Sequence, residues 1–295
     1  MKQAKKPTTI LRQRRKTALF LIPSLVGVLV FYLLPLLVVF YYSLQSRPVN
    51  GEFVGLQNYA ALLNNYAFRL AAKNTALLCL ITVPLAVVLS LALALVLERR
   101  LPMEGFLRSA LLSPLVVPAA SVVLVWQIIF HNNGLINALL QALGLNTADF
   151  FATGWSRVMV LILYLWKNLG YNILLFTSGL ASVPRELTDM AELDGATPWQ
   201  KFCAVKLPYL GPSTLFVTIL SFISALKIFR EVWLLAGSYP HSTMYMLQHF
   251  MYNTFQTMDY QKLCTAAVLL TAVTVGIVYV FFRWEKRVEG QVVGA

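Results

Sequence analysis

Charged residues are scarce in this sequence of 295 residues. Asp, Glu, Lys and Arg make up 12% of it and hydrophobic residues 58%, and the mean hydropathy is +0.68. Because a soluble domain has about a quarter charged and about half apolar residues, this composition excludes an ordinary soluble fold. Five stretches contain no charged residue at all: 17–45, 74–97, 109–148, 207–226 and 263–282. Each is long enough to cross about 30 Å of hydrocarbon as a helix, which takes about 20 residues.

The residues that carry most enzyme chemistry are also few. The three cysteines and three histidines have no spacing typical of a metal site or a redox pair. No Gly-Lys dipeptide occurs, so the chain lacks the GxxxxGK[ST] loop that cradles ATP phosphates. The sequence therefore predicts no catalytic residue, no metal site and no cofactor in this chain, and we do not expect it to be an enzyme.

A sixth apolar run, 158–183, is interrupted only by Lys167. Lipid offers no partners for backbone polar groups, and the runs lack the alternation of barrel strands, so helices are required. We expect an all-α membrane protein with one domain, 18–283, between a basic N-terminal tail, 1–17, and a C-terminal tail, 284–295. The six predicted spans lie near 18–44, 74–97, 109–130, 158–181, 214–236 and 263–283.

The basic residues are distributed unevenly between the two sides of this predicted domain. Seven precede the first span, three lie between the second and third spans, three lie in the segment 183–212 and three follow the last span, whereas the opposite loops hold five. The positive-inside rule therefore places both termini and the segment 183–212 in the cytoplasm. The net charge of +12 is divided among short loops and forms no footprint for nucleic acid. No cleavage pattern follows the basic start, so we expect an uncleaved first helix.

The segment 183–212 is polar although it lies between two apolar spans. Its Pro184 suits the first turn of a helix, where a missing N–H has no cost. Three acidic residues follow at spacings of three, Glu186, Asp189 and Glu192, on one face and near the positive end of the helix dipole. We expect a short amphipathic helix at this position.

A glycine turn and a second helix are predicted to follow. Gly195 can adopt the left-handed conformation that ends a helix. Thr197 suits the N-cap and Pro198 the first position of the next helix. The aromatic rings of Trp199 and Phe202 are suited to pack that helix down. Two interpretations stay open, a docking element for another protein and a solvated connecting loop. Two capped helices favour docking, because a connecting loop needs only a short turn.

Residues 189–196, which read DMAELDGA, and the later Leu207-Pro208 pair resemble the cytoplasmic signature loop of permease subunits of bacterial ABC importers. That loop has the pattern E-A-A-x-x-D-G-A followed by Leu-Pro, so Asp189 and Met190 depart from it. In this family the loop sits in a cleft of the ATPase. The resemblance implies the same contact for the stretch 184–212, which we call the coupling segment. The implied contact residues are Glu186, Asp189, Ala191, Glu192, Asp194, Gly195 and Ala196.

Other parts of the chain resemble the carbohydrate-uptake branch of that family, the maltose and glycerol-3-phosphate type. Residues 54–59 (VGLQNY) are similar to its external loop motif after the first span, and residues 226–233 (LKIFREVW) to its fifth span. The resemblance implies the type I ABC importer permease fold in the bacterial inner membrane. It also implies several partners: a second permease, two ATPase subunits that bind ATP and Mg, an extracytoplasmic solute-binding protein and a sugar substrate.

Polar residues inside two predicted spans are candidates for contact with the solute, because intramembrane polar groups normally face a cavity or a partner. In each span they follow one another at helical spacing on one face. The predicted substrate-path residues are Asn168, Tyr171 and Asn172 in the fourth span, and Ser224, Lys227 and Glu231 in the fifth. Two alternatives stay open. Lys227 and Glu231, four residues apart, neutralise each other, or Lys167 and Arg230 snorkel towards an interface.

Two classes of function fit these patterns. The first is a permease subunit of an ATP-driven, binding-protein-dependent importer that forms half of the translocation pathway for a mono- or oligosaccharide. Within this class, the intramembrane cations also suit a non-sugar anionic solute such as a phosphodiester. The second is a secondary carrier driven by an ion gradient. Such a carrier needs acidic or histidine residues buried in its spans, and Glu231 is the only acidic residue in the six predicted spans.

Overall fold

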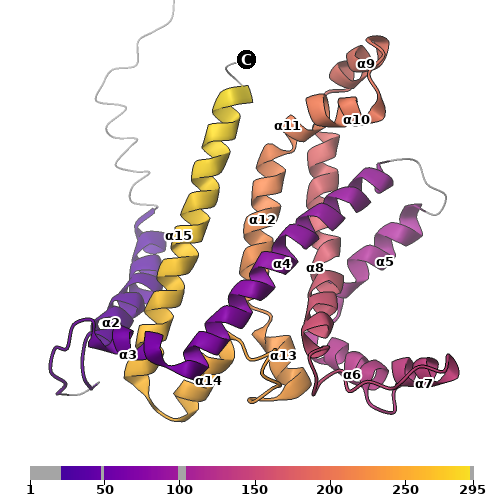
Figure 1. The fold of residues 1–295 in the computed structure, drawn as a ribbon. Coiled ribbons are helices and arrows are strands. Elements are labelled where there is room, and N and C mark those ends of the chain that lie inside the picture. The colour runs from indigo at the N-terminus through magenta and orange to yellow at the C-terminus, as the bar shows by residue number, and fades with distance from the viewer. Residues whose placement is uncertain (1–20, 48–49, 99–103, 293–295) are drawn as a thin grey trace, which may run out of the picture. The chain divides into compact units, whose positions relative to one another are not determined.

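The computed structural model describes residues 21–47, 50–98 and 104–292, and these are almost entirely helical (Figure 1). Six helical stretches in the described part are long and apolar enough to cross a membrane: Leu21–Ser43, Tyr66–Leu97, Ala119–Ala142, Ser156–Ala181, Gly211–Ala236 and Tyr260–Trp284. The prediction of an all-α membrane protein with six spans is therefore confirmed. The predicted basic tail, 1–17, lies outside the described residues.

The helical elements are joined by connections of different lengths. In chain order they are η1 (Leu29–Leu33), α2 (Leu34–Ser43), α3 (Gln57–Asn64), α4 (Tyr66–Leu97), α5 (Glu104–Val116), α6 (Ala119–Phe130), α7 (Leu135–Ala142), α8 (Ser156–Ala181), α9 (Arg185–Leu193), α10 (Pro198–Lys201), η2 (Phe202–Lys206), α11 (Leu207–Tyr209), α12 (Gly211–Leu226), α13 (Phe229–Ala236), α14 (Leu247–Gln256) and α15 (Tyr260–Val292). The two η elements are π-helical turns. The chain divides into two compact units, Met1–Asn64 with Thr254–Ala272, and Asn65–Asn253 with Val273–Ala295.

In the first unit, hydrogen bonds hold the connection between α2 and α3. The side-chain nitrogen of Asn58 donates to the carbonyl oxygens of Ser43 and Gln45 at 2.9 and 2.8 Å. The hydroxyl groups of Ser43 and Tyr59 are 2.7 Å apart. The last carbonyl groups of a helix have no partner within it, so Asn58 satisfies one that α2 leaves open. The motif at 54–59 therefore has a structural role in ending the first span.

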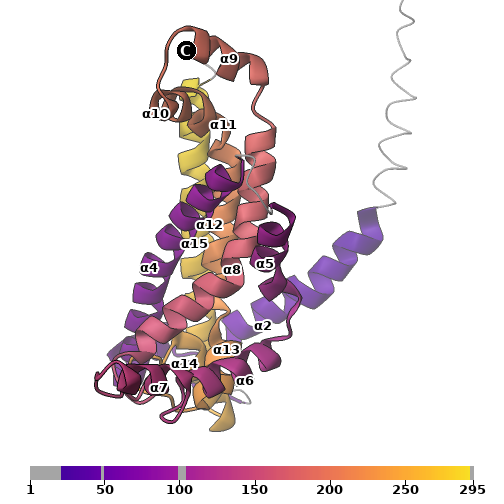
Figure 2. The ribbon, with the colours of Figure 1, turned by 90° about the vertical axis from the view of Figure 1, so that its right-hand side faces the viewer.

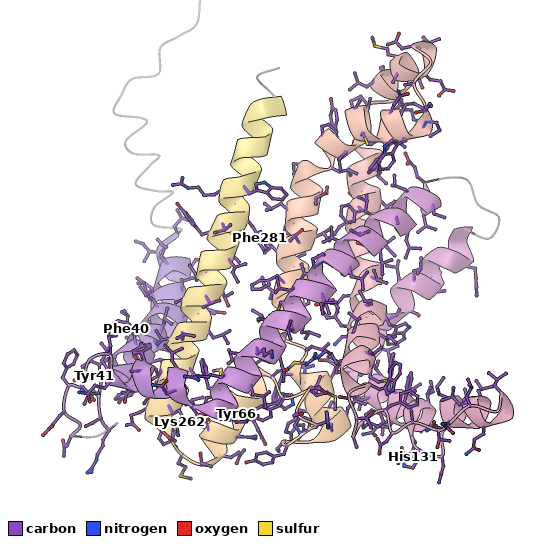
Figure 3. All side chains as sticks on the ribbon, viewed as in Figure 1. Phe40, Tyr41, Tyr66, His131, Lys262 and Phe281 are labelled. Carbon is purple, nitrogen blue, oxygen red and sulfur yellow. The ribbon has the colours of Figure 1, made fainter. Side chains whose placement is uncertain are left out.

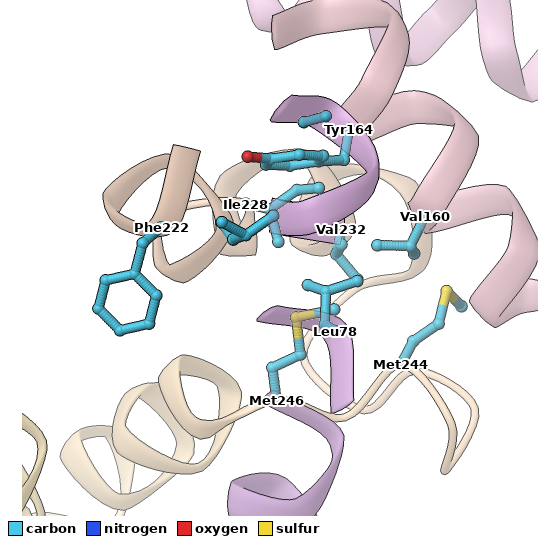
Figure 4. Packing of buried hydrophobic residues seen from close by; sticks show 11 residues of the cluster. Leu78, Val160, Tyr164, Phe222, Ile228, Val232, Met244 and Met246 are labelled. Atoms are coloured by element: carbon cyan, nitrogen blue, oxygen red, sulfur yellow. The ribbon is translucent and has the colours of Figure 1, made fainter. Parts of the chain in front are cut away.

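In the second unit, α4, α8 and α12 pack together (Figures 1 and 2). Their core contains Leu78 of α4, Tyr164 of α8, Phe222 of α12 and Val232 of α13 (Figure 4). Figure 3 labels Phe281 on α15. Its ring meets that of Phe222 edge-on, with the ring centroids 6.3 Å apart. The buried hydroxyl of Tyr164 donates to a backbone carbonyl of α12 at 2.7 Å. An aromatic core with its polar atom satisfied holds α8 and α12 in a defined register.

Glycine permits a close backbone approach between α5 and α8. A Cβ atom added to Gly170 would lie 2.0 Å from the carbonyl oxygen of Leu111, a distance that no side chain can accept. Small residues at helix crossings let backbones approach in membranes, where no hydrophobic effect draws helices together. Gly170 is therefore a packing residue at the crossing of α5 with α8.

The predicted third span, 109–130, is wrong in its bounds. α5 ends at Val116 and α6 begins at Ala119, and in Figure 1 the two helices run in different directions. Pro118 lies at the N-cap of α6. Proline has no N–H to donate and disfavours the helical conformation in the residue before it, so the helix breaks there. The apolar stretch of spanning length in this region is Ala119–Ala142.

The fifth span contains a second break. α12 ends at Leu226 and α13 begins at Phe229, with Lys227 and Ile228 as turn residues between them. Neither turn residue is proline or glycine, so no local sequence signal marks the break. Backbone that leaves the helical conformation at membrane depth is tolerated where it is buried in protein or lines a polar cavity. The break therefore predicts that Lys227 is buried in protein or lines a polar cavity.

Candidate functional sites

The coupling segment, 184–212, forms a helix, a glycine turn and a second helix, as predicted (Figure 1). α9 begins directly after Pro184, which is its N-cap rather than part of its first turn. Gly195 follows α9 with a φ of +74°, in the left-handed region. The N–H of Ala196 donates to the carbonyl of Ala191 at 3.0 Å. This bond closes the C-terminus of α9 in the way typical of a glycine-ended helix.

The start of α10 carries a capping box. The hydroxyl of Thr197 accepts from the N–H of Gln200 at 3.3 Å, and the side chain of Gln200 accepts from the N–H of Thr197 at 2.8 Å. Pro198 occupies the first position of this helix. Reciprocal capping satisfies two backbone donors that a helix start leaves open. The predicted N-cap at Thr197 is confirmed.

Two ion pairs connect the coupling segment internally and to α4. Lys201 of α10 donates to Glu192 of α9 at 2.9 Å. The hydrogen bond and the charge of Lys201 lower the pKa of the Glu192 carboxyl below its ordinary value. Lys206 of η2 donates to both carboxylate oxygens of Glu98, which follows α4, at 2.8 and 2.6 Å. The first ion pair therefore links α9 to α10, and the second links η2 to the end of α4.

Apolar side chains of the coupling segment are exposed. The exposed fractions are 61% for Met190, 88% for Leu193 and 71% for Trp199. The prediction that Trp199 packs its helix down is wrong, because its ring only lies beside Phe202, with centroids 5.5 Å apart. Large apolar groups in a polar segment outside the spans are typical of a surface that another protein covers. We call Met190, Leu193 and Trp199 the apolar coupling patch.

The seven residues predicted to contact an ATPase all lie on α9 or in the turn that follows it. Five are exposed and the two alanines are partly buried. The acidic side chains alternate with Met190 and Leu193 along the sequence, and all of them precede Trp199. Contact of these residues with a partner stays a prediction. The exposed residues are Glu186, Asp189, Glu192, Asp194 and Gly195, and the partly buried ones are Ala191 and Ala196.

A polar cavity of about 390 Å³ lies where α8 faces the break between α12 and α13. It brings together four of the six predicted substrate-path residues, Asn168, Ser224, Lys227 and Glu231. The other lining residues are Leu163, Tyr164, Lys167, Ile228, Phe229, Arg230 and Gln248. Pockets for small molecules have volumes of about 300–1,000 Å³, so this cavity can hold a small solute.

The acidic residue of the cavity pairs with Lys167. The amine of Lys167 on α8 donates to the carboxylate of Glu231 on α13, whose exposed fraction is 4%. The proposed alternative of a pair between Lys227 and Glu231 is therefore wrong. Because the helix breaks after Leu226, these two residues do not lie on one continuous helix. The alternative that Lys167 snorkels to an interface is also wrong, because its amine pairs with Glu231 in the cavity.

The remaining two predicted substrate-path residues lie elsewhere. Tyr171 is 40% exposed on α8 and does not line the cavity. Asn172 is buried, and its side-chain nitrogen donates to the hydroxyl of Ser221 on α12 at 2.9 Å. This bond joins two neighbouring helices, so Asn172 has a packing contact in this structure. Asn168 lines the cavity and also donates to the carbonyl of Tyr164 at 2.8 Å.

Sequence reasoning missed five of the residues that line the cavity: Leu163, Tyr164, Ile228, Phe229 and Gln248. Gln248 lines the cavity from α14. This helix lies outside the six predicted spans, so a search for polar residues within the spans did not include it. Phe229 lines the cavity beside the helix break, and its ring meets His249 edge-on at 4.7 Å between centroids. Only the spacing LKIFREVW, already noted as a family motif, could have pointed to Phe229. Within the described ranges, no group of three or more His, Cys, Asp and Glu side chains could hold a metal ion.

The chain matches the family model described as "Binding-protein-dependent transport system inner membrane component" over residues 17–292. It is 30% identical over 269 residues to the trehalose/maltose transport system permease protein MalF of Thermococcus litoralis, covering 90% of this chain and 91% of that protein. It is 32% identical over 282 residues to the arabinooligosaccharides transport system permease protein AraP of Bacillus subtilis, covering 92% and 90%.

The fold is similar to a chain in the crystal structure of a bacterial ABC transporter involved in the import of the acidic polysaccharide alginate. The TM-score is 0.81 with 18% sequence identity, and the match covers 96% of this chain and 99% of the other. A second structure of that transporter, in complex with an alginate pentasaccharide-bound periplasmic protein, matches with the same TM-score. At this identity the likeness shows the fold alone.

Proposed function

This chain belongs to the family of binding-protein-dependent transport system inner membrane components, the permeases of ABC importers, and we propose that it forms half of a sugar translocation pathway. The other half would come from a second permease. The curated relatives are named for transport of trehalose and maltose and of arabino-oligosaccharides, which supports a mono- or oligosaccharide as the solute. We place the protein in the bacterial inner membrane, with both termini and the coupling segment in the cytoplasm.

The observation that carries this proposal is the coupling segment. It presents the apolar coupling patch of Met190, Leu193 and Trp199 on two capped helices, together with the acidic side chains of α9 and of the turn that follows it. The chain contains no P-loop, and we propose that a partner ATPase supplies the energy for transport. A rigid, exposed and partly apolar element fits a cleft of an ATPase. ATP bound by that ATPase, with Mg, would act on this chain through the patch.

The mechanism is a shift between two populations. ATP and a loaded extracytoplasmic binding protein would favour a state open to the outside, and hydrolysis a state open to the cytoplasm. In this chain the displacement enters at α9 and passes to α10 through Glu192 and Lys201. It reaches α4 through Lys206 and Glu98, and α12 through the short elements η2 and α11. Both long helices help to form the unit that contains the cavity.

The substitution Leu193→Asp tests this proposal. Leu193 is 88% exposed, so the change leaves the fold of the isolated chain intact. In a docked complex it buries a carboxylate without a partner, which costs at least about 1.4 kcal/mol, or about tenfold in affinity. We expect at least that loss of ATPase co-purified with the chain, together with loss of ATP-driven sugar uptake in proteoliposomes.

Leu143→Asp is the matched control. Leu143 is also an exposed leucine beside a glycine, at the end of α7 and outside the coupling segment. This variant should retain the ATPase. If the wild-type chain never co-purifies with an ATPase, and if uptake continues in vesicles without ATP, the proposed function is wrong and an ion-driven carrier replaces it.

A further inference from the structure

The charge of the cavity narrows the class of solute. We propose that the cavity between α8 and the α12–α13 break takes an anionic carbohydrate, a sugar that carries a carboxylate or another acidic group, with Lys227 and Arg230 as its charge contacts. The proposal rests on the proposed function, since it names the substrate class of that same pathway. It goes further than a general preference for sugars, because a neutral sugar would leave both cations without a counter-charge.

The cavity contains more positive than negative charge. Three basic residues line it, Lys167, Lys227 and Arg230, against the single acidic residue Glu231. Lys167 is already paired with Glu231. In the described part of the chain, neither Lys227 nor Arg230 forms an ion pair with a carboxylate, and both side chains are exposed. Two cations therefore remain for a ligand.

Free cations in a membrane span have a cost that a ligand can offset. Lys227 and Arg230 lie within the apolar stretch Gly211–Ala236. Charged side chains in spans normally pair with each other or line the path of a charged solute. Snorkelling does not explain Lys227, because it is a turn residue at the helix break and lines the cavity. An anionic group in the cavity would provide the missing negative charge.

The helix break adds positive potential at the same place. The first turn of α13, which contains Phe229, Arg230 and Glu231, lines the cavity. The start of a helix carries a partial positive charge and favours an anion nearby. Glu231 also lies in this first turn, but the charge of Lys167 neutralises the charge of its carboxylate. Discontinuous helices whose ends face the solute are a recurrent feature of transport sites.

The remaining lining residues suit the neutral part of a sugar. Asn168, Ser224 and Gln248 offer amide and hydroxyl groups for sugar hydroxyls, and the ring of Phe229 offers an apolar face. These residues surround the two cations in a volume of about 390 Å³. A bare inorganic anion would use the cations and leave these polar groups without partners. The combination favours a sugar acid over a simple anion.

The test measures binding to the purified importer complex in nanodiscs, without the solute-binding protein, so that its selectivity does not enter. The probes are D-glucuronate, D-glucose and inorganic phosphate. We expect glucuronate to bind about tenfold more tightly than glucose, a difference that one close charge contact at an effective dielectric of about 20 can supply. In the variant Lys227→Gln/Arg230→Gln the preference should disappear, so that the two sugars bind within about twofold of each other.

Arg47→Gln/Arg283→Gln is the control for net charge. It removes two exposed basic residues outside the cavity and should keep the preference for glucuronate. The inference is overturned if glucuronate binds no more tightly than glucose, or if phosphate binds as tightly as glucuronate. It is also overturned if the cavity variant no longer assembles with the second permease, since the cations then pair with that subunit. None of these results affects the coupling test with Leu193→Asp, so the two proposals can fail separately.

Discussion

The coupling segment and the cavity are two polar regions of an apolar chain, and their ion pairs differ in exposure to water. In the coupling segment, Lys201 pairs with Glu192, nine residues away along the chain, and Glu192 is exposed. In the cavity, Lys167 pairs with Glu231 across two helices and 64 residues, and Glu231 is buried. Water reaches the carboxylate of the first pair and is largely excluded from the carboxylate of the second.

This difference shows where charge is structurally expensive. An exposed pair gains little, because water solvates either partner almost as well when the other is absent. A buried carboxylate depends on its cation, because desolvation without a partner has a large cost. The chain can therefore vary the charges of its coupling segment freely for recognition, whereas the buried carboxylate of Glu231 requires a cation beside it.

Loss of Lys167 should have the largest effect of any change to these two regions. Lys167→Met leaves Glu231 buried without its cation, and we expect a loss of about 3 kcal/mol in the free energy of unfolding, the lower end for broken buried pairs. The partly exposed side of Lys167 towards the cavity justifies the lower end. The measurement is the unfolding free energy of the purified chain in detergent.

Two further variants distinguish a charge effect from a packing effect. Glu231→Gln should cost less than Lys167→Met, because Lys167 is more exposed and its amine can reach water. The double variant Lys167→Met/Glu231→Gln should recover most of the stability, since neither charge remains. Additive losses in the double variant would contradict a coupled pair.

The sequence predicts the coupling segment well because its signals are local. Gly195 ends α9 and Thr197 begins α10 through contacts with residues a few positions away. Capping residues act within one turn, so their identity is sufficient to predict them. Trp199 is the exception, since its exposure depends on what is absent around it and not on its neighbours in sequence.

The cavity was predicted only in part because its geometry is not local. The helical spacing of polar residues correctly predicted that Asn168 and Ser224 line the same cavity. The pairing of Glu231 depends on a helix break without a proline or glycine, which leaves Glu231 within reach of Lys167 on α8. The break at Pro118 differs, because the proline is visible in the sequence. The span 109–130 was nevertheless predicted across it, because the stretch 109–148 is apolar and contains no charged residue.

A cap in the coupling segment should have a smaller and more local effect than the buried pair. Thr197→Ala removes the hydroxyl that accepts from Gln200, and we expect a loss of about 1 kcal/mol in the local stability of α10. Hydrogen exchange of the amides of α10 and η2 measures this loss. Thr188→Ala is the control, because Thr188 lies inside α9 and its hydroxyl only donates to the carbonyl of Arg185. Equal losses in both variants would contradict the capping role.

The smallest effect concerns the exposed pair itself and appears as a dependence on pH. Lys201 lowers the pKa of Glu192 in the folded chain below its ordinary value of 4.5. The contribution of the pair is therefore complete above that ordinary value, and it is lost as the pH falls through the lower folded pKa. Hydrogen exchange of α9 and α10, corrected for intrinsic rates, should show weaker protection on acidification.

In Glu192→Gln the pair is absent at every pH, so protection should be lower already at pH 7 and change less. Other carboxylates of the segment titrate in both proteins, so only the difference between them reports on Glu192. A wild-type chain that loses protection no more than Glu192→Gln would mean that water screens this pair completely.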